Sequence, residues 1–185
     1  MNIAAIKTYD IANGPGVRVS VFVSGCTRGC KGCFQPQTWD FSYGEAFTDD
    51  TLRFLLSELA NPHIAGLTLL GGEPFEPRNQ AEVARLLRLV REQFPKKSIW
   101  AFTGYVYEEL LAGRVGNPAL VRQMLSCLDV LVDGPFEIEK KDLSLRFRGS
   151  SNQRLIDLQK SRENHAVTLW DDGYQRGGMS CRASL

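Results

Sequence analysis

The sequence predicts an α/β fold, a partial, open (β/α) barrel built on a mostly parallel sheet. Three observations support this prediction. Short apolar segments of strand character alternate with amphipathic helical segments up to about residue 135. Each apolar segment ends in a loop rich in glycine, proline or cysteine. A chain of 185 residues offers too few strands to close an eight-stranded barrel, so the barrel is expected to stay open.

The first strand is expected over residues 17–24, where Val-Arg-Val-Ser-Val-Phe-Val-Ser alternates between apolar and polar residues. It is preceded at residues 13–16 by Asn-Gly-Pro-Gly, a turn sequence in which glycine tolerates positive φ and proline fixes φ. The segment after the strand, up to about Gly44, is polar and interrupted, so it predicts a long loop.

Helices and short apolar strands then alternate. Thr48 is expected to begin the first helix, whose leucines recur at helical spacing until Asn61-Pro62 ends it. The remaining elements are strands expected over residues 66–70, 98–102 and 129–132, and helices expected over residues 79–93, 105–112 and 118–128. This order predicts parallel strands joined by right-handed crossovers.

The pattern weakens after residue 136. Residues 140–185 hold nine basic and five acidic residues, which we interpret as a solvated basic face. The last part mixes a short helical segment with glycine-rich, charged sequence. We therefore expect one domain over residues 1–154 and a peripheral or partly disordered tail over residues 155–185.

Composition restricts the classes of function. The hydrophobic content is 43% and the net charge is +1, so neither nucleic-acid nor membrane binding is expected. No signal peptide and no run of about 18 apolar residues is visible. The cysteine number is five, which is odd, and three of the five are crowded together. This argues against a secreted disulfide framework and favours a reducing cytoplasm.

The crowded cysteines are Cys26, Cys30 and Cys33, in the spacing C-x3-C-x2-C directly after the first expected strand. A cubane iron–sulfur cluster usually takes four cysteines, so three would leave one iron with an open position. A zinc site, which usually has four ligands, and a coincidence of spacing are the alternatives. His63 and His165 lie far off in the sequence without ligand spacing.

Two further cysteines are expected to bind no metal. Cys127 falls in an apolar helical segment and is expected to be a core thiol, because free cysteine is among the most buried residue types. Cys181 lies in the tail and is expected to be a loose thiol.

Unusual loops follow the later strands as well. The loops are Gly71-Gly72-Glu73-Pro74, then Thr103-Gly104-Tyr105, then Asp133-Gly134-Pro135-Phe136. Ligands of parallel α/β sheets bind outside the carboxyl ends of the strands, so these loops and the cysteine loop are expected to form one site. Glycines would let a ligand approach the backbone, and Glu73 would accept hydrogen bonds from an ammonium group. Thr103 and Asp133 are polar contacts for the same ligand or simply turn and cap residues.

The cysteine spacing followed by Gly-Gly-Glu-Pro resembles the radical S-adenosylmethionine (SAM) enzymes. Asn-Gly-Pro-Gly-Val-Arg at residues 13–18 resembles, more narrowly, the glycyl-radical-enzyme activases. Further matches resemble the activating proteins of anaerobic ribonucleoside-triphosphate reductase. These matches are Cys-Lys-Gly-Cys-Phe at residues 30–34, Thr-Gly-Tyr at 103–105, Val-Asp-Gly at 132–134 and Arg-Gly-Ser-Ser-Asn-Gln at 148–153. The resemblance covers about residues 6–154.

The resemblance implies a radical-SAM activase with two cofactors. The three cysteines would bind a [4Fe-4S] cluster, whose open iron would chelate the amino and carboxylate groups of S-adenosyl-L-methionine. Its implied contacts are Gly71, Gly72 and Glu73 at the amino end, with Thr103 and Asp133 nearby, and Gly32, Cys33 and Phe34 on the adenosyl side.

The resemblance also implies two partners. The substrate would be a glycine of anaerobic ribonucleoside-triphosphate reductase, and a reduced flavodoxin-type protein would supply the electron. The segment 148–154 is the candidate for partner contact or site closure. Two alternatives stay open: a radical-SAM enzyme that acts on another glycyl-radical enzyme or on a small molecule, and a non-enzymatic metal-binding module.

Overall fold

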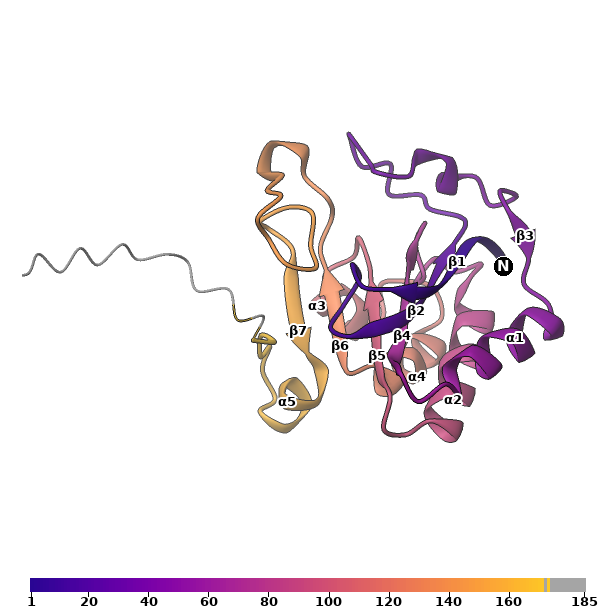
Figure 1. The fold of residues 1–185 in the computed structure, drawn as a ribbon. Helices are drawn as coiled ribbons and strands as arrows, with labels where there is room; N and C mark the ends of the chain where they lie inside the picture. The colour runs from indigo at the N-terminus through magenta and orange to yellow at the C-terminus, as the bar shows by residue number, and fades with distance from the viewer. Residues whose placement is uncertain (172, 174–185) are drawn as a thin grey trace, which may run out of the picture.

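The computed structural model describes residues 1–171 and 173, and its centre is one sheet (Figure 1). The strands are β1 (Asn2–Asp10), β2 (Val17–Val23), β3 (Glu45–Ala46), β4 (Ile64–Gly71), β5 (Ser98–Phe102), β6 (Val130–Asp133) and β7 (Arg154–Asp157). Within the described residues they pair in the order β3-β1-β2-β4-β5-β6-β7. The neighbours β2, β4, β5 and β6 are parallel, whereas β1 and β7 flank them antiparallel. The expected α/β class and the parallel centre of the sheet are confirmed.

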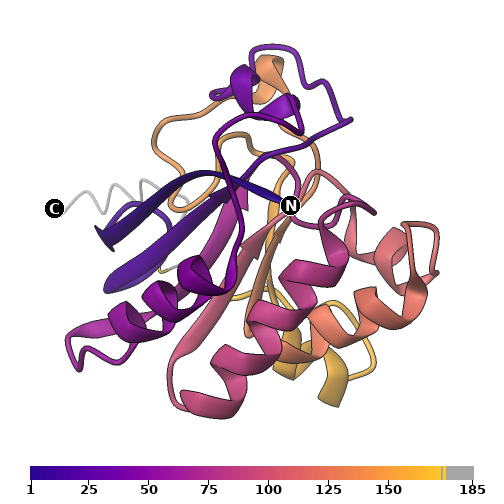
Figure 2. The same cartoon turned by 90° about the vertical axis from the view of Figure 1, so that its right-hand side faces the viewer.

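Helices connect the parallel strands, and α1, α2 and α4 cover one face of the sheet (Figure 2). The helices are α1 (Asp49–Leu59), α2 (Gln80–Gln93), α3 (Tyr107–Leu111), α4 (Pro118–Cys127) and α5 (Leu158–Glu163), with short 3₁₀ helices η1 (Pro36–Trp39) and η2 (Ile138–Lys140). Capping residues determine where α1 and α4 begin. The Thr48 hydroxyl accepts the Thr51 N–H at 3.2 Å, and Asn117 caps α4 just before Pro118. The predicted helices are confirmed.

The two faces of the sheet are packed differently. On β5, Ile99 and Ala101 belong to the main core beneath the helices, so Trp100 between them points to the opposite face. There Trp100 joins a smaller cluster that is covered by Phe147 and Trp170, with ring centroids 5.5 and 4.9 Å from that of Trp100. Loop residues therefore cover this second face near β5, whereas helices cover the first.

A buried arginine ties three central strands together at their amino ends. Arg18 of β2 is fully buried and lies over the Trp100 ring. Its guanidinium donates to the Thr68 hydroxyl at 2.7 Å, to Ser98 Oγ and O at 2.8 and 3.0 Å, and to the carbonyl oxygens of Leu67 and Pro15. Burial lowers the pKa of Arg18 to about 10, so it stays charged at neutral pH.

Two flanking strands correct the sequence expectation. Residues 2–10 are not predicted as a strand, because the consecutive apolar residues Ile3, Ala4, Ala5 and Ile6 do not alternate with polar ones. The tail expected from residue 155 is also wrong at its start. Leu155 and Ile156 of β7 are buried and pair with β6, and Leu158 is buried in the main core. Two apolar residues flanked by charge are too short a pattern to predict a strand from sequence.

Cys181, which is expected from the sequence to be a loose thiol, lies outside the described residues. Within residues 1–171 and 173, none of the helices combines the length and the apolar character that a membrane span requires.

Candidate functional site

One cavity of about 570 Å³ lies at the carboxyl edge of the parallel strands. Its lining includes Cys26, Cys30 and Cys33 after β2, Gly71, Gly72 and Glu73 after β4, Thr103 and Gly104 after β5, and Gly134 and Phe136 after β6. All four loops that the sequence placed on one rim therefore contribute to one cavity. This follows from the parallel arrangement of β2, β4, β5 and β6, which puts their carboxyl ends at the same edge.

The three cysteines are free thiols, each partly exposed to the cavity. Burial and the nearby carboxylates of Glu73 and Glu76 raise the pKa of the Cys26 thiol to about 11. A thiol in such surroundings becomes a thiolate when a metal cation replaces its proton. The site therefore has the donor chemistry of a metal centre and none of the features of a disulfide.

Hydrogen bonds fix the start of the cysteine loop. Thr27 donates its N–H and its hydroxyl to the buried carboxylate of Glu76, at 2.7 and 2.5 Å. The Arg28 guanidinium stacks over the Tyr105 ring, 4.6 Å from its centroid. The loop that carries the first two cysteines is thus anchored to the loops after β4 and β5. Glu76 was missed from the sequence, where its only signal is its place three residues after Glu73.

Glu73 joins the loops after β4 and β5. Its side chain is 1% exposed and accepts hydrogen bonds from Phe75 N at 2.9 Å, Thr103 Oγ1 at 2.8 Å and Gly104 N at 2.7 Å. Burial raises the pKa of Glu73 to about 7, although these hydrogen bonds oppose the rise. A carboxylate has about four acceptor positions, so one remains for a donor in the cavity.

The two glycines before Glu73 allow close contact with the cysteine loop. A Cβ atom at Gly71, whose φ is +105°, would lie 2.7 Å from Val23 O. A Cβ atom at Gly72 would lie 2.7 Å from Gly25 O. Backbone hydrogen bonds join the same segments, because Gly72 N donates to Val23 O and Glu73 N to Gly25 O. Both positions therefore need glycine for the backbone alone, before any ligand is considered.

Comparisons with known proteins match this geometry. A family model described as a 4Fe-4S single cluster domain matches residues 12–156. The anaerobic ribonucleoside-triphosphate reductase-activating protein of bacteriophage T4 is 41% identical over 155 residues, which cover 84% of this chain and 93% of the phage protein. The proteins of the same name from Pasteurella multocida and Escherichia coli K12 are 42% and 39% identical, over 83% of this chain and at least 95% of their own lengths. The chain belongs to the anaerobic ribonucleoside-triphosphate reductase-activating proteins.

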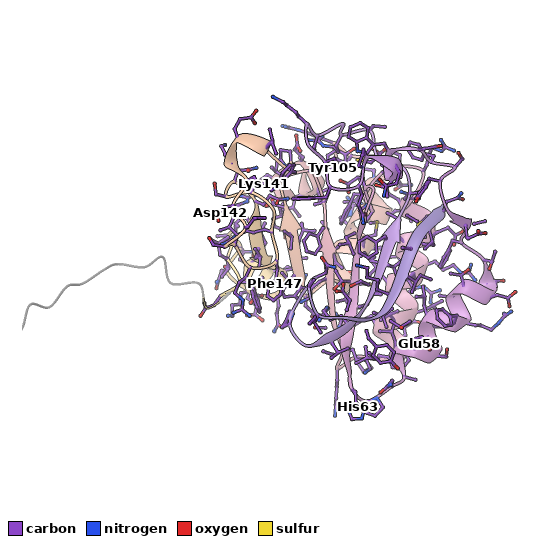
Figure 3. All side chains as sticks on the ribbon, turned by 45° about the horizontal axis from the view of Figure 1, so that its top comes forward. Glu58, His63, Tyr105, Lys141, Asp142 and Phe147 are labelled. Atoms are coloured by element: carbon purple, nitrogen blue, oxygen red, sulfur yellow. The ribbon has the colours of Figure 1, made fainter. Side chains whose placement is uncertain are left out.

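The expected cofactors of such an activating protein are a [4Fe-4S] cluster and SAM, and the family assignment supports both. The donor set fits the cluster. Within the described residues, no three His, Cys, Asp or Glu side chains surround a point that could hold a single metal ion. A cubane offers each cysteine a different iron, so the three cysteines that line one cavity can each bind one iron. His63 lies at the opposite end of the molecule from Tyr105 of the loop after β5 (Figure 3).

Two residues that the sequence placed at the site do not line the cavity of this activating protein. Gly32 faces η2, where a Cβ atom would lie 3.0 Å from Ile138 Cδ1. Asp133 is fully buried, and its carboxylate accepts Tyr107 N at 2.8 Å and the Arg154 guanidinium. A strand-end position alone could not distinguish these buried packing and ion-pair roles from ligand contact.

The remaining predicted residues and several unpredicted ones do line the cavity. Phe34 is 61% exposed there and packs against Phe136, with ring centroids 4.9 Å apart. The open face of the sheet adds Lys7, Phe22, Leu70 and Phe102, and the segment between β6 and β7 adds Asp142, Leu143, Leu145, Phe147, Arg148, Gly149 and Gln153. The four sheet positions carry no local sequence signal, because only the register of the strands brings them to one face. Arg148, Gly149 and Gln153 belong to the segment 148–154, which the resemblance marks as a candidate for partner contact or site closure.

Proposed function

We propose that this chain cleaves SAM reductively and generates a glycyl radical on anaerobic ribonucleoside-triphosphate reductase. The observation that supports this most is the convergence of Cys26, Cys30 and Cys33 on one cavity with Gly71-Gly72-Glu73. Relatives named as activating proteins of that reductase, at about 40% identity over most of both chains, favour this substrate. They also favour it over another glycyl-radical enzyme or a small molecule.

The cofactors perform the bond-breaking, and the chain binds and orients them. When bound, a reduced cluster would supply the electron for cleavage of SAM into methionine and a 5′-deoxyadenosyl radical, which would take a hydrogen atom from a glycine Cα. Cys26, Cys30 and Cys33 would hold the cluster and would leave one iron open for the amino and carboxylate groups of SAM. Glu73 offers its remaining acceptor position to the amino group, beside the Gly71-Gly72 backbone and Thr103. Cys33 and Phe34 line the adenosyl side.

The protein substrate has to reach the cavity with its backbone. We therefore propose that the sheet is the wall of a partial barrel whose open side admits the glycine-bearing loop. The absence of a helix over Lys7, Phe22 and Phe102, within the described residues, supports this arrangement. The electron would come from a reduced flavodoxin-type donor. The odd number of cysteines, three of them crowded together, favours a reducing cytoplasm.

Anaerobic reconstitution with iron and sulfide tests the function. We expect the protein to bind about four irons per chain and to release 5′-deoxyadenosine from SAM under dithionite. Added anaerobic ribonucleoside-triphosphate reductase should then show the EPR doublet of a glycyl radical. Reconstituted protein that never yields 5′-deoxyadenosine would refute the proposal. A doublet on a different glycyl-radical enzyme, and none on the reductase, would refute the substrate assignment.

A further inference from the structure

In the segment 148–153, Arg-Gly-Ser-Ser-Asn-Gln, the side chains of Ser150, Asn152 and Gln153 form hydrogen bonds with this chain's own backbone. Gln153 Oε1 accepts the N–H groups of Gly149 and Ser150 at 2.8 and 3.2 Å, and its Nε2 donates to Gly134 O at 3.1 Å. Asn152 Nδ2 donates to Pro135 O at 2.7 Å, and the buried Ser150 hydroxyl accepts Glu137 N at 3.2 Å. The segment therefore holds the backbone of residues 134–137, directly after β6.

The backbone that is held in this way carries Phe136. The Phe136 ring packs on Phe34 with centroids 4.9 Å apart and planes tilted by 52°. Gly149 lies against both rings, because a Cβ atom there would be 3.0 Å from Phe34 Cε2 and 3.1 Å from Phe136 Cδ2. We call Phe34, Phe136 and Gly149 the aromatic wall. The wall lines the cavity beside Cys33, the residue before Phe34 in the chain.

We propose that Gln153 is a positioning residue for the third cysteine. Its three hydrogen bonds fix the 149–150 turn to the strand end at Gly134, and this sets where Phe136 and Gly149 press on Phe34. Phe34 in turn sets the place of Cys33 and of the adenosyl side of SAM. The proposal rests on the proposed function for its catalytic consequence. Its structural part, the fixing of Cys33, stands without that function.

The contacts argue against the alternative that the side chains of Ser150, Asn152 and Gln153 recognise the reductase. The side-chain amides of Asn152 and Gln153 donate to carbonyl oxygens of the loop after β6, and Ser150 is fully buried. Donors that already bind backbone carbonyl oxygens would have to break those bonds to bind a partner, at about 1 kcal/mol each. These hydrogen bonds therefore hold the segment to the loop after β6 of the same chain.

Three variants test the proposal in the cluster-loaded full chain. Gln153→Ala removes all three hydrogen bonds, Gln153→Glu keeps the two acceptor positions, and Gly149→Ala displaces the aromatic rings. Ile156→Val, buried in β7 within the helix-side core, lowers stability without touching the wall and serves as the control. We expect Gln153→Ala and Gly149→Ala to weaken SAM binding about tenfold and to change the EPR shift that SAM induces in the reduced cluster. We expect the Gln153→Glu variant to bind SAM with an affinity between those of wild type and Gln153→Ala. The Ile156→Val variant should have the SAM affinity and the EPR shift of the wild type.

A second readout uses the full chain without cluster. Alkylation of each thiol, followed by mass spectrometry, should show Cys33 reacting faster in Gln153→Ala while Cys26 and Cys30 keep their wild-type rates. The proposal is overturned if Cys33 keeps its wild-type rate, or if all three thiols accelerate equally in Gln153→Ala and in Ile156→Val. An unchanged SAM affinity and EPR shift would overturn the catalytic part. If wild type never cleaves SAM, the proposed function fails, whereas the alkylation result still decides the role of Gln153.

Discussion

Glu73 is a carboxylate that is almost entirely shielded from water, so its ionisation opposes folding. Its pKa is raised from the ordinary value of 4.5 to about 7 by burial. A carboxyl group whose pKa is higher in the folded than in the unfolded chain does not lower stability at a pH below the unfolded-state pKa. Stability is lost as the pH rises from the unfolded-state pKa to the folded-state pKa. We therefore expect the cluster-free protein to lose up to about 3 kcal/mol of unfolding free energy between pH 4.5 and 7 through this group.

Glu73→Gln provides the comparison, because glutamine does not ionise. Urea unfolding at half-unit pH steps should give wild type a decline across this window that is absent from the variant. Since other groups titrate in both proteins alike, the difference between the two curves isolates Glu73. Parallel curves would show that Glu73 keeps an ordinary pKa in the folded chain.

Cysteines at different places in the fold should differ sharply in their importance. Cys30→Ser should abolish iron binding and 5′-deoxyadenosine release, because Cys26 and Cys33 are the only other thiols that line the cavity among the described residues. Cys127, which is buried in α4, should tolerate serine with unchanged iron content and a stability loss of about 1–2 kcal/mol. We also expect the Cys181→Ser variant to have the same iron content as the wild type. Iron assays of the three purified variants check this, and iron loss in Cys127→Ser or Cys181→Ser would contradict it.

The sequence identified some site residues and missed others for a physical reason. Cys26, Cys30 and Cys33 form a local pattern, and Glu73 follows two glycines at a strand end. Glu76 acts through bonds to Thr27, which is distant in the sequence, so no local pattern marks it. Gln153 lies in the segment 148–154, which the resemblance marks as a candidate for partner contact or site closure, but its bond to Gly134 O could not be read from the sequence. For Asp133 the sequence left ligand contact and a turn or cap role open, and in the structure its carboxylate accepts the Tyr107 N–H at the start of α3 and pairs with Arg154.

At the scale of elements, one ion pair joins the late strand β7 to the sheet. Arg154 of β7 binds the Asp133 carboxylate, which is 1% exposed, and also Glu108 of α3, which is 54% exposed. Arg154→Met would leave Asp133 buried without a cation, so we expect it to cost about 3–5 kcal/mol of unfolding free energy. Glu108→Gln removes only the exposed contact and should cost less than about 1 kcal/mol. Equal losses in urea unfolding would contradict this assignment.

A second prediction concerns β2, β4 and β5, which Arg18 joins at the edge away from the cavity. Arg18→Lys keeps the charge but replaces a planar group that serves five acceptors with a single ammonium. We expect a loss of about 3 kcal/mol, because several buried oxygen atoms lose their donors. Arg88→Lys on the exposed surface of α2 is the matched control and should change stability by less than about 0.5 kcal/mol. Thermal unfolding of both variants tests the difference.

At the scale of the whole molecule, the parallel centre of the sheet could be predicted and its flanks could not. Alternating helices and strands predict that the strands run parallel, as β2, β4, β5 and β6 do. The strands β1 and β7 depend on antiparallel pairing with partners that lie in the centre, and their own sequences bury few side chains. The carboxyl-edge site followed from the centre alone, whereas the cavity lining from the segment between β6 and β7 did not.

The aromatic wall has a consequence for how this protein is made. Cys26, Cys30 and Cys33 leave the ribosome early, but the Phe136, Gly149 and Gln153 contacts beside Cys33 are encoded far downstream. A nascent chain that ends before β6 therefore exposes the three thiols without the packing that places the third. The proposed role of Gln153 therefore implies that the site takes its final shape for the cluster only after residue 153 has left the ribosome.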